Sequence, residues 1–267
     1  MDVQNCEGIE YLQKIQDESV DLVLTDPPYI TSRKSGMDAL WNQVHSAQGP
    51  AKTEEDWEKY RTSKKLEDDP KKRENYIQYG TVYGKEFALK TQYGEWDANF
   101  TMDTLDTFVK LLYKKLKPGG TIIIWFDLWK ITPLKEMLER HKFKQIRFIE
   151  WIKNNPAPIN SGINYLSNAR EMALTAVKKS KPTFNSKYDN GVYHYPLCAG
   201  KGRFHPTQKN EALFIDLIKK HSHEGAVVLD PFLGSGTTLR ACQKTGRVCK
   251  GCEVNKEYFD QMNALLK

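Results

Sequence analysis

The stretch "AVVLDPFLGSGTTLRA", residues 226–241, joins an apolar run to a glycine loop and then to a segment with helical spacing. A strand, a loop with Gly234 and Gly236, and a helix in this order let a ligand approach backbone that side chains would otherwise block. Thr237 and Thr238 stand where a dinucleotide fingerprint would continue toward its third glycine, and the G-K-[ST] ending of a P-loop is absent. The stretch therefore favours a nucleoside ligand without a pyrophosphate. A purely structural turn is the alternative.

The same alternation of apolar runs and amphipathic segments extends along the rest of the chain. The predicted strands are Val3–Cys6, Val20–Thr25, Thr121–Phe126, Ile146–Ile152, Met172–Val177, Ala226–Leu229 and Val248–Val254. The predicted helices are Gly8–Ile15, Met102–Leu116, Trp129–His141, Asn210–Lys220 and Thr237–Thr245. Alternating strands and helices are typical of a mostly parallel sheet covered on both faces. We therefore expect a doubly wound α/β domain with a seven-stranded sheet.

The stretch "DPPY", residues 26–29, ends one of these strands abruptly. Neither proline supplies a backbone N–H, and each ring fixes φ, so the strand cannot continue. Asp26 and Asp230 both follow apolar strands, and ligands of open parallel sheets bind at the carboxyl ends of strands where the strand order reverses. If the two strands are neighbours, the two loops face one crevice. Glu253, at the end of a later strand, is then placed to accept hydrogen bonds from ribose hydroxyls.

Composition limits the class of protein. The chain has 267 residues, a net charge of +6 and five cysteines. The odd number of cysteines favours reduced thiols and a cytoplasmic setting. The first residues do not resemble a signal peptide, and no apolar stretch approaches the length of a membrane span. Cys249 and Cys252 are spaced C-x-x-C, but no second pair or nearby histidine completes a zinc site, so we predict no metal. The positive charge is compatible with a nucleic-acid partner.

Two regions interrupt the strand and helix rhythm. Residues 31–93 are polar, and between Ala51 and Asn75 they hold eight basic and eight acidic residues. Such a segment cannot bury much apolar surface, so we interpret it as an insertion in a single domain that spans residues 1–267. The second region, residues 154–203, is rich in Asn, Lys, Tyr and Pro and encloses one strand.

Several motifs together resemble one enzyme family. "DPPY" at 26–29, "HPTQK" at 205–209 and "DPFLGSGTT" at 230–238 resemble the catalytic, entry and cofactor motifs of amino-group DNA methyltransferases that use S-adenosylmethionine. The order, with the catalytic motif first, resembles the β class, a permuted form of the Rossmann-like class I methyltransferase fold. The likeness continues in "KPGGTIIIWF", "EWIKNNPAP" and "YPLCAGKGRFHPTQK", and residues 151–238 resemble the cell-cycle-regulated adenine methyltransferases.

The resemblance implies a catalytic centre made of Asp26, Pro27, Pro28 and Tyr29. An exocyclic amine is a poor nucleophile because its lone pair is delocalised into the ring. Asp26 would accept one N–H of the amine and the Pro27 carbonyl oxygen the other, which favours a pyramidal nitrogen aimed at the methyl group. The prolines would hold these acceptors rigidly. Tyr29 would stack on a base rotated out of the duplex.

The resemblance also implies a site for S-adenosylmethionine. Its residues would be Asn5, Cys6, Asp26, Thr207, Gln208, Lys209, Asp230, Phe232, Leu233, Gly234, Ser235, Gly236, Thr237, Thr238, Glu253 and Val254. Glu253 would meet the ribose, and Lys209 with its two predecessors the carboxylate end. Asn5 replaces an acidic residue that relatives often place against the adenine amine, and its side-chain oxygen can still accept a hydrogen bond. His205 is either a capping residue or a contact, and Asn210 replaces a proline that commonly follows the entry motif.

DNA contacts are predicted at Ser32, Arg33, Lys34, Asn154 and Asn155, and residues 154–203 are the candidate target-recognition region. Ordinary solvated loops are the alternative for these residues.

The predicted activity is sequence-specific methylation of adenine N6 in double-stranded DNA. Cytosine N4 methylation, which more often uses serine in place of Asp26, is one alternative, and an RNA or free-base substrate is another. A third alternative is a non-catalytic nucleic-acid-binding subunit. A fourth is a dinucleotide oxidoreductase, which the missing third glycine disfavours. The resemblance allows a homodimer and a cognate restriction endonuclease as partners. It places the protein in a bacterial cytoplasm or among phage-encoded enzymes, away from the membrane.

Overall fold

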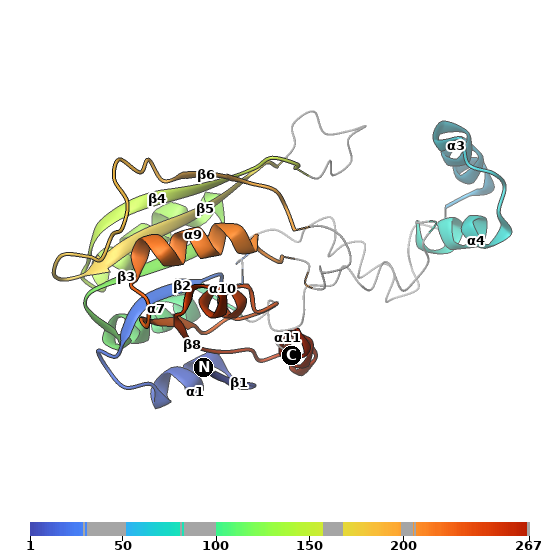
Figure 1. Ribbon diagram of the computed structural model, residues 1–267. Helices are drawn as coiled ribbons and strands as arrows, with labels where there is room; N and C mark the ends of the chain where they lie inside the picture. The colour runs from blue at the N-terminus through green and yellow to red at the C-terminus, as the bar shows by residue number, and fades with distance from the viewer. Residues whose placement is uncertain are drawn as a thin grey trace. The chain divides into compact units, whose positions relative to one another are not determined.

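A computed structural model describes residues 1–28, 30, 52–80, 82, 100–156, 168–198, 205 and 207–265. The chain divides into two compact units, one made of residues 1–29 and 100–267 and the other of residues 30–99. The first unit carries the sheet, and the second carries helices α3 and α4 (Figure 1). The extents predicted for the polar insertion, residues 31–93, and for the target-recognition region remain predictions.

The first unit is built on one sheet, which has eight strands among the described residues. The strands are β1 (Asp2–Gln4), β2 (Val20–Thr25), β3 (Leu116–Phe126), β4 (Phe143–Lys153), β5 (Arg170–Lys178), β6 (Val192–Tyr195), β7 (Val227–Asp230) and β8 (Val248–Cys252), in the order β1-β8-β7-β2-β3-β5-β4-β6. Neighbouring strands are parallel except at β5, which runs antiparallel to β3 and β4.

This arrangement confirms the predicted mostly parallel α/β fold and corrects the predicted number of strands from seven to eight. The additional strand, β6, lies at the edge of the sheet beside β4. Its sequence, V-Y-H-Y, has no run of apolar side chains, which is why periodicity did not reveal it. Its backbone pairs with β4 nonetheless, and the pairing decides its structure.

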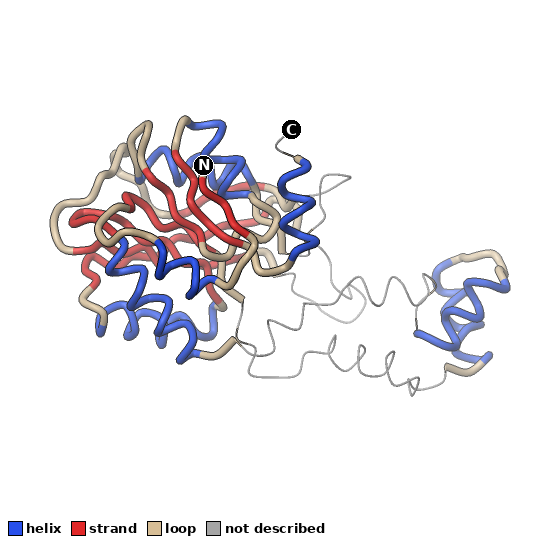
Figure 2. The backbone as a smooth tube through the Cα atoms, turned by 90° about the horizontal axis from the view of Figure 1, so that it is seen from below, coloured by secondary structure: helices blue, strands red, loops and turns tan. Residues whose placement is uncertain are grey.

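Helices cover both faces of the sheet (Figure 2). They are α1 (Gly8–Lys14), α7 (Met102–Lys115), α8 (Ile131–Arg140), α9 (Glu211–His221), α10 (Thr237–Thr245) and α11 (Lys256–Ala264), with a short 3-10 turn at Leu128–Lys130. Apolar side chains of α9, α10 and α11 join one core cluster with Leu24 and Trp125 of the sheet. Helix α7 contacts both α1 and α8, which do not belong to this cluster.

The centre of the sheet contains its topological switch point. From β2 the chain continues to the neighbouring β3 on one side, whereas β7 continues to β8 on the other. The reversal therefore falls between β2 and β7, which pair through Leu22 with Val228 and Val23 with Leu229. Open α/β sheets bind ligands at such a point, outside the carboxyl ends of the strands. Because β5 is antiparallel, its first residues lie at that same edge.

The described residues of the second unit include two helices, α3 (Glu54–Lys64) and α4 (Pro70–Tyr79). Asp69 caps α4 by accepting hydrogen bonds from two backbone N–H groups, directly before a proline at the first helical position. Trp57 is fully buried, and the rings of Tyr60 and Tyr76 stack with centroids 4.4 Å apart. This polar segment thus packs its helices around a small aromatic cluster of its own.

No helix in the described ranges has the combined length and apolar character needed to cross a membrane. Within those ranges, no group of three or more His, Cys, Asp or Glu side chains is arranged to hold a metal ion.

Candidate active site

Asp26 directly follows β2, and its two carboxylate oxygens have different surroundings. Oδ2 forms an ion pair with Lys209 Nζ at 2.7 Å. Oδ1 is buried and has no hydrogen-bond partner in the described part of the chain. Burial raises the pKa of Asp26 to about 6, although the nearby ammonium of Lys209 lowers it. One oxygen is therefore held in place, and the other is available to accept a hydrogen bond.

The next two residues, Pro27 and Pro28, offer no backbone hydrogen-bond donor. Pro27 is buried and Pro28 is half-buried, and neither has a backbone N–H that could compete for Oδ1 of Asp26. Tyr29, Ser32, Arg33 and Lys34, to which the sequence assigned base stacking and DNA contacts, lie outside the described residues.

Lys209 belongs to a buried network of charges. Its ammonium, with a side chain only 6% exposed, lies 2.7 Å from Asp26 and 2.8 Å from Oε2 of Glu171. It also lies 5.9 Å from the ring centroid of Trp125. The other oxygen of Glu171 is 2.8 Å from Lys153 Nζ. Two carboxylates and two ammonium groups thus alternate at this edge of the sheet.

Strand pairing explains how these residues meet. Trp125 on β3 is opposite Ala173 on β5, and Glu171 is opposite Trp151 on β4. Side chains two residues apart point to the same face of a strand. Glu171 and Lys153 therefore share the face of Trp125, which is also the face that α9 covers.

The sequence analysis missed Glu171 and Lys153 and assigned Lys209 to the cofactor. The predicted strand began at Met172, two residues after the observed start of β5 at Arg170, and so left Glu171 outside it. The sequence signal that could have revealed Glu171 is its charge, which interrupts the period-2 pattern at the start of an apolar strand. The structure brings Lys209 to Asp26, and its predicted contact with the cofactor remains a prediction.

Asp230, at the end of β7, braces the glycine loop. Its Oδ1 accepts hydrogen bonds from Thr25 Oγ1 at 2.7 Å and from Phe232 N–H at 3.0 Å, and its Oδ2 accepts one from Thr238 Oγ1 at 2.6 Å. Burial raises the pKa of Asp230 to about 6, although these hydrogen bonds lower it. The carboxylate thereby ties together β2, the loop and α10, which confirms that β2 and β7 bring the two motifs to one place.

The loop itself depends on two left-handed glycines. Gly234 has φ +50° and Gly236 has φ +74°. A Cβ on Gly236 would clash with Met262 of α11, so the close packing of this helix also requires glycine. Gly234 N–H donates to Oε2 of Glu253 at 2.8 Å, while the other oxygen of Glu253 accepts from Asn255 N–H at 2.8 Å. Glu253 is thus fixed beside the loop from the end of β8.

Other residues predicted to bind the cofactor lie in the glycine loop or at the ends of β1 and β8. Asn5 donates its side-chain amide to the carbonyl oxygens of Glu253 and Val254 at 2.7 and 3.1 Å, which ties the end of β1 to the end of β8. Its side-chain oxygen is the group that can face a ligand. Phe232 packs against Phe108, with ring centroids 4.6 Å apart. The half-buried Cys6 follows Asn5, Val254 is exposed, and four loop side chains are buried, namely Leu233, Ser235, Thr237 and Thr238.

The "HPTQK" segment lies against the glycine loop. The imidazole of His205 is positioned 3.5 Å from where a Cβ on Gly234 would be, and it contacts the ring of Tyr258 with centroids 4.5 Å apart. His205 Nδ1 accepts a hydrogen bond from Thr207 N–H at 3.3 Å. Gln208 donates to Cys198 Sγ at 3.2 Å, away from the loop. The segment therefore contacts the loop through His205 and Asp26 through its lysine.

Asparagines support the neighbouring elements. Asn210 caps α9 by accepting from Leu213 N–H at 3.0 Å, so this helix begins well without the proline of relatives. Asn155 accepts from Leu197 N–H at 2.6 Å, which gives it a structural contact. Asn154 is exposed.

A family model described as DNA methylase, of the N6 and N4 type, matches residues 20–264 of this chain. The chain belongs to this DNA methylase family.

Relatives and solved structures agree with this assignment. The methylase is 28% identical to the Type II methyltransferase M2.DpnII of Streptococcus pneumoniae, over 96% of this chain and 85% of the relative. It is 27% identical to M2.LlaDCHI of Lactococcus lactis, with the same coverage. The crystal structure of the M1.HpyAVI–SAM complex aligns with this chain at 24% sequence identity and a TM-score of 0.62. The alignment covers 100% of this chain and 98% of the M1.HpyAVI chain. The cytosine-N4-specific PvuII methyltransferase shares the fold, with 16% identity, coverage of 98% and 84%, and a TM-score of 0.65.

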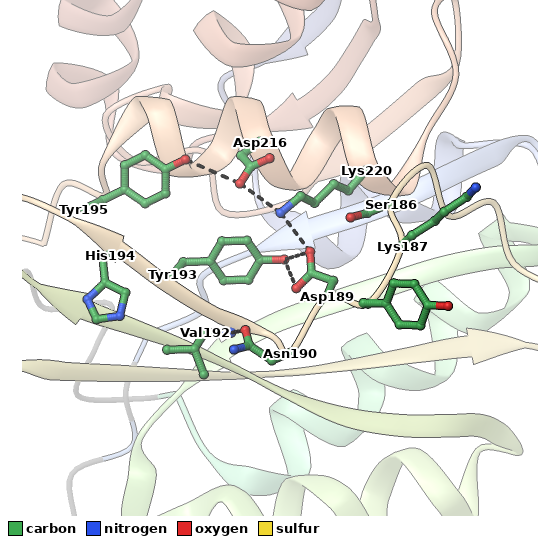
Figure 3. Close-up of a pocket in the computed structure, with 11 residues that line it drawn as sticks. Ser186, Lys187, Asp189, Asn190, Val192, Tyr193, His194, Tyr195, Asp216 and Lys220 are labelled. Carbon is green, nitrogen blue, oxygen red and sulfur yellow. Dashed lines mark hydrogen bonds and ion pairs between the residues drawn. The ribbon is translucent and has the colours of Figure 1, made fainter.

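A hollow of the methylase lies between β6 and α9, with a volume of about 440 Å³ (Figure 3). Lys220 Nζ lies 2.8 Å from Asp189 and 3.1 Å from Asp216. Tyr193 and Tyr195 donate their hydroxyl groups to these two carboxylates. These five polar side chains therefore satisfy one another.

Proposed function

We propose that this DNA methylase transfers the methyl group of S-adenosylmethionine to the N6 amine of adenine in double-stranded DNA, at a specific short sequence. One observation carries the proposal: Oδ1 of Asp26 is a buried acceptor without a described partner, at the switch point of the sheet. A buried acceptor of this kind has a free-energy cost until a donor reaches it. The exocyclic amine of a flipped base supplies such a donor.

The residues at this point suit an amine substrate. Asp26 Oδ1 accepts one amine N–H and the Pro27 carbonyl oxygen accepts the second, which localises the nitrogen lone pair. Lys209 holds the other oxygen of Asp26 at 2.7 Å and so restricts rotation of the carboxylate. After methylation the nitrogen carries one proton too many, and Oδ1 is placed to receive it. Alignment, more than a strong base, is what these residues provide.

The residues of the crevice also fit S-adenosylmethionine, which supplies a methyl group already activated by its sulfonium charge. Glu253 is held by two backbone N–H groups beside the glycine loop, and a carboxylate so placed accepts hydrogen bonds from ribose hydroxyls. The loop offers backbone rather than side chains at Gly234. The structure of M1.HpyAVI was solved with this cofactor, which supports the same site here.

Adenine is favoured over cytosine because Asp26 stands where cytosine-N4 enzymes more often have serine. The test is incubation of the protein with radiolabelled S-adenosylmethionine and mixed-sequence duplex DNA, followed by nucleoside analysis and sequencing of the modified sites. Label in N6-methyladenine supports the proposal. Label in N4-methylcytosine, label only when RNA is supplied, or no transfer at all would each refute it.

Partners follow from the names of the relatives, which are Type II methyltransferases. We extend this to a role beside a cognate restriction endonuclease in a bacterium or phage. A homodimer and a cytoplasmic location belong to the same proposal. Sedimentation of the purified chain with and without duplex DNA tests the dimer.

A further inference from the structure

We propose that Glu171 is a positioning residue for methyl transfer: by sharing the ammonium of Lys209, it keeps Asp26 basic enough to receive the proton of the methylated amine. This inference rests on the proposed function, because it concerns how Asp26 performs it. Glu171 acts on Asp26 through Lys209 and does not itself contact the substrate.

The geometry makes Lys209 a shared cation. Its Nζ lies 2.7 Å from Asp26 Oδ2 and 2.8 Å from Glu171 Oε2, so neither carboxylate has it alone. The side chain is 6% exposed, so water cannot replace a lost partner easily. Lys153 holds the other oxygen of Glu171 at 2.8 Å, and its side chain is 10% exposed. With both acids ionised, the four charges of the network balance.

Protonation of Asp26 would otherwise be opposed by its own lysine. A buried ammonium whose single carboxylate partner becomes neutral is left uncompensated, which is strongly unfavourable. Glu171 removes this obstacle because Lys209 keeps one ionised partner when Asp26 takes up a proton. In the balanced step, an N–H bond of the methylated amine breaks, the proton forms an O–H bond at Oδ1, and the nitrogen returns to neutral.

The other groups that face Asp26 leave this assignment unchanged. Asp230, on the neighbouring β7, raises the pKa of Asp26 as Glu171 does, but three hydrogen bonds hold its carboxylate to Thr25, Phe232 and Thr238. Trp125 on β3 offers its ring to Lys209 and carries no charge. Glu171 is therefore the described acid that contacts both lysines of the network.

Glu171→Gln removes the charge and keeps the shape of the side chain. The negative charge of Glu171 then no longer raises the pKa of Asp26, so that pKa should fall. We expect the acidic limb of the pH profile of kcat to move to lower pH by about one unit, because a close opposite charge lowers a carboxyl pKa by roughly one to three units. The plateau of kcat should fall several-fold, because a weaker base takes the proton less readily. KM for S-adenosylmethionine and for DNA should change by less than about twofold.

The control is Asp189→Asn. Asp189 and Lys220 also lie 2.8 Å apart and are largely buried, with side chains 10% and 21% exposed. Lys220 stands in the last turn of α9 and points toward Asp189 (Figure 3). This variant removes a comparable ion pair and should leave the acidic limb in place. Glu171→Asp keeps the charge on a shorter side chain and should give an intermediate shift. It carries the test alone if Glu171→Gln does not fold.

The pKa of Asp26 is also measured without turnover, by ¹³C NMR titration of labelled aspartate carboxyl groups, with Asp26→Asn to assign the signal. If the wild-type protein does not methylate DNA but Glu171→Gln still lowers the pKa of Asp26, the proposed function is refuted. The inference that Glu171 and Asp26 share the charge of Lys209 is then still supported. A wild-type protein that methylates DNA while Glu171→Gln leaves the limb and the pKa unmoved, or moves them upward, overturns the inference.

Discussion

Replacing Asp26 with asparagine should make the protein more stable and inactive at the same time. Asparagine resembles the protonated carboxyl group in size and in charge. The pKa of Asp26 rises from its ordinary 3.8 to about 6 in the native state, chiefly because of burial. The ionised carboxylate is therefore a source of instability at neutral pH.

The magnitude follows from the size of the pKa difference. About two pH units between the unfolded and native states correspond to about 3 kcal/mol. The side chain keeps 18% of its exposure, so solvent screens part of this, and we expect Asp26→Asn to stabilise the protein by about 2 kcal/mol at neutral pH.

The sign depends on pH in a defined way. Below about pH 4 the carboxyl group of Asp26 is protonated in both states, so the wild type and the variant should be equally stable. Between about pH 4 and pH 6 the unfolded chain releases its proton first, and the wild type loses stability as the pH rises. Above the native pKa, which is about 6, the gap should be constant. Asp230 has a raised pKa as well, but it is present in both proteins and cancels.

The assay is urea denaturation of wild type and Asp26→Asn in steps from about pH 4 to about pH 8. Methyl transfer to duplex DNA is measured with radiolabelled cofactor, and cofactor affinity by calorimetry. We expect transfer to fall by at least about 10²-fold, with the affinity for cofactor within a few-fold of wild type. A variant that is less stable than wild type at about pH 8, or a gap that does not vary with pH, would refute the reasoning, and so would wild-type turnover.

Two further substitutions test the glycine loop and the start of α9. Gly236→Ala should destabilise the protein by roughly 1–3 kcal/mol and weaken cofactor binding, because its Cβ would clash with Met262. The matched control in urea denaturation is Gly225→Ala, because Gly225 has φ +76° and open space around it. Equal losses of stability in both variants would contradict the packing argument. Asn210→Ala should lower stability by about 1 kcal/mol, because α9 loses the cap on Leu213 N–H; unchanged stability would mean that water replaces the cap.

Much of the fold followed from local sequence patterns. The alternation of apolar runs and amphipathic segments predicted a mostly parallel α/β sheet, because one-sided burial imposes a period on each element. Strand β6 was not predicted because backbone pairing at the sheet edge, rather than an apolar pattern, decides its structure. Helix α11 escaped as well, although Asn255 caps it, because a short polar helix has little periodicity of its own.

The sequence by itself determined which chemistry the chain carries. The "DPPY" and "DPFLGSGTT" motifs combine prolines and glycines with acids directly after apolar strands, and these local constraints hold in any surroundings. Only the tertiary structure decided which charges meet. Lys209 contacts Asp26 and Glu171 because β2 lies beside β3 and because β5 runs antiparallel, which brings its first residues to the ligand edge. Strand order and direction are properties of the whole sheet, and no single segment encodes them.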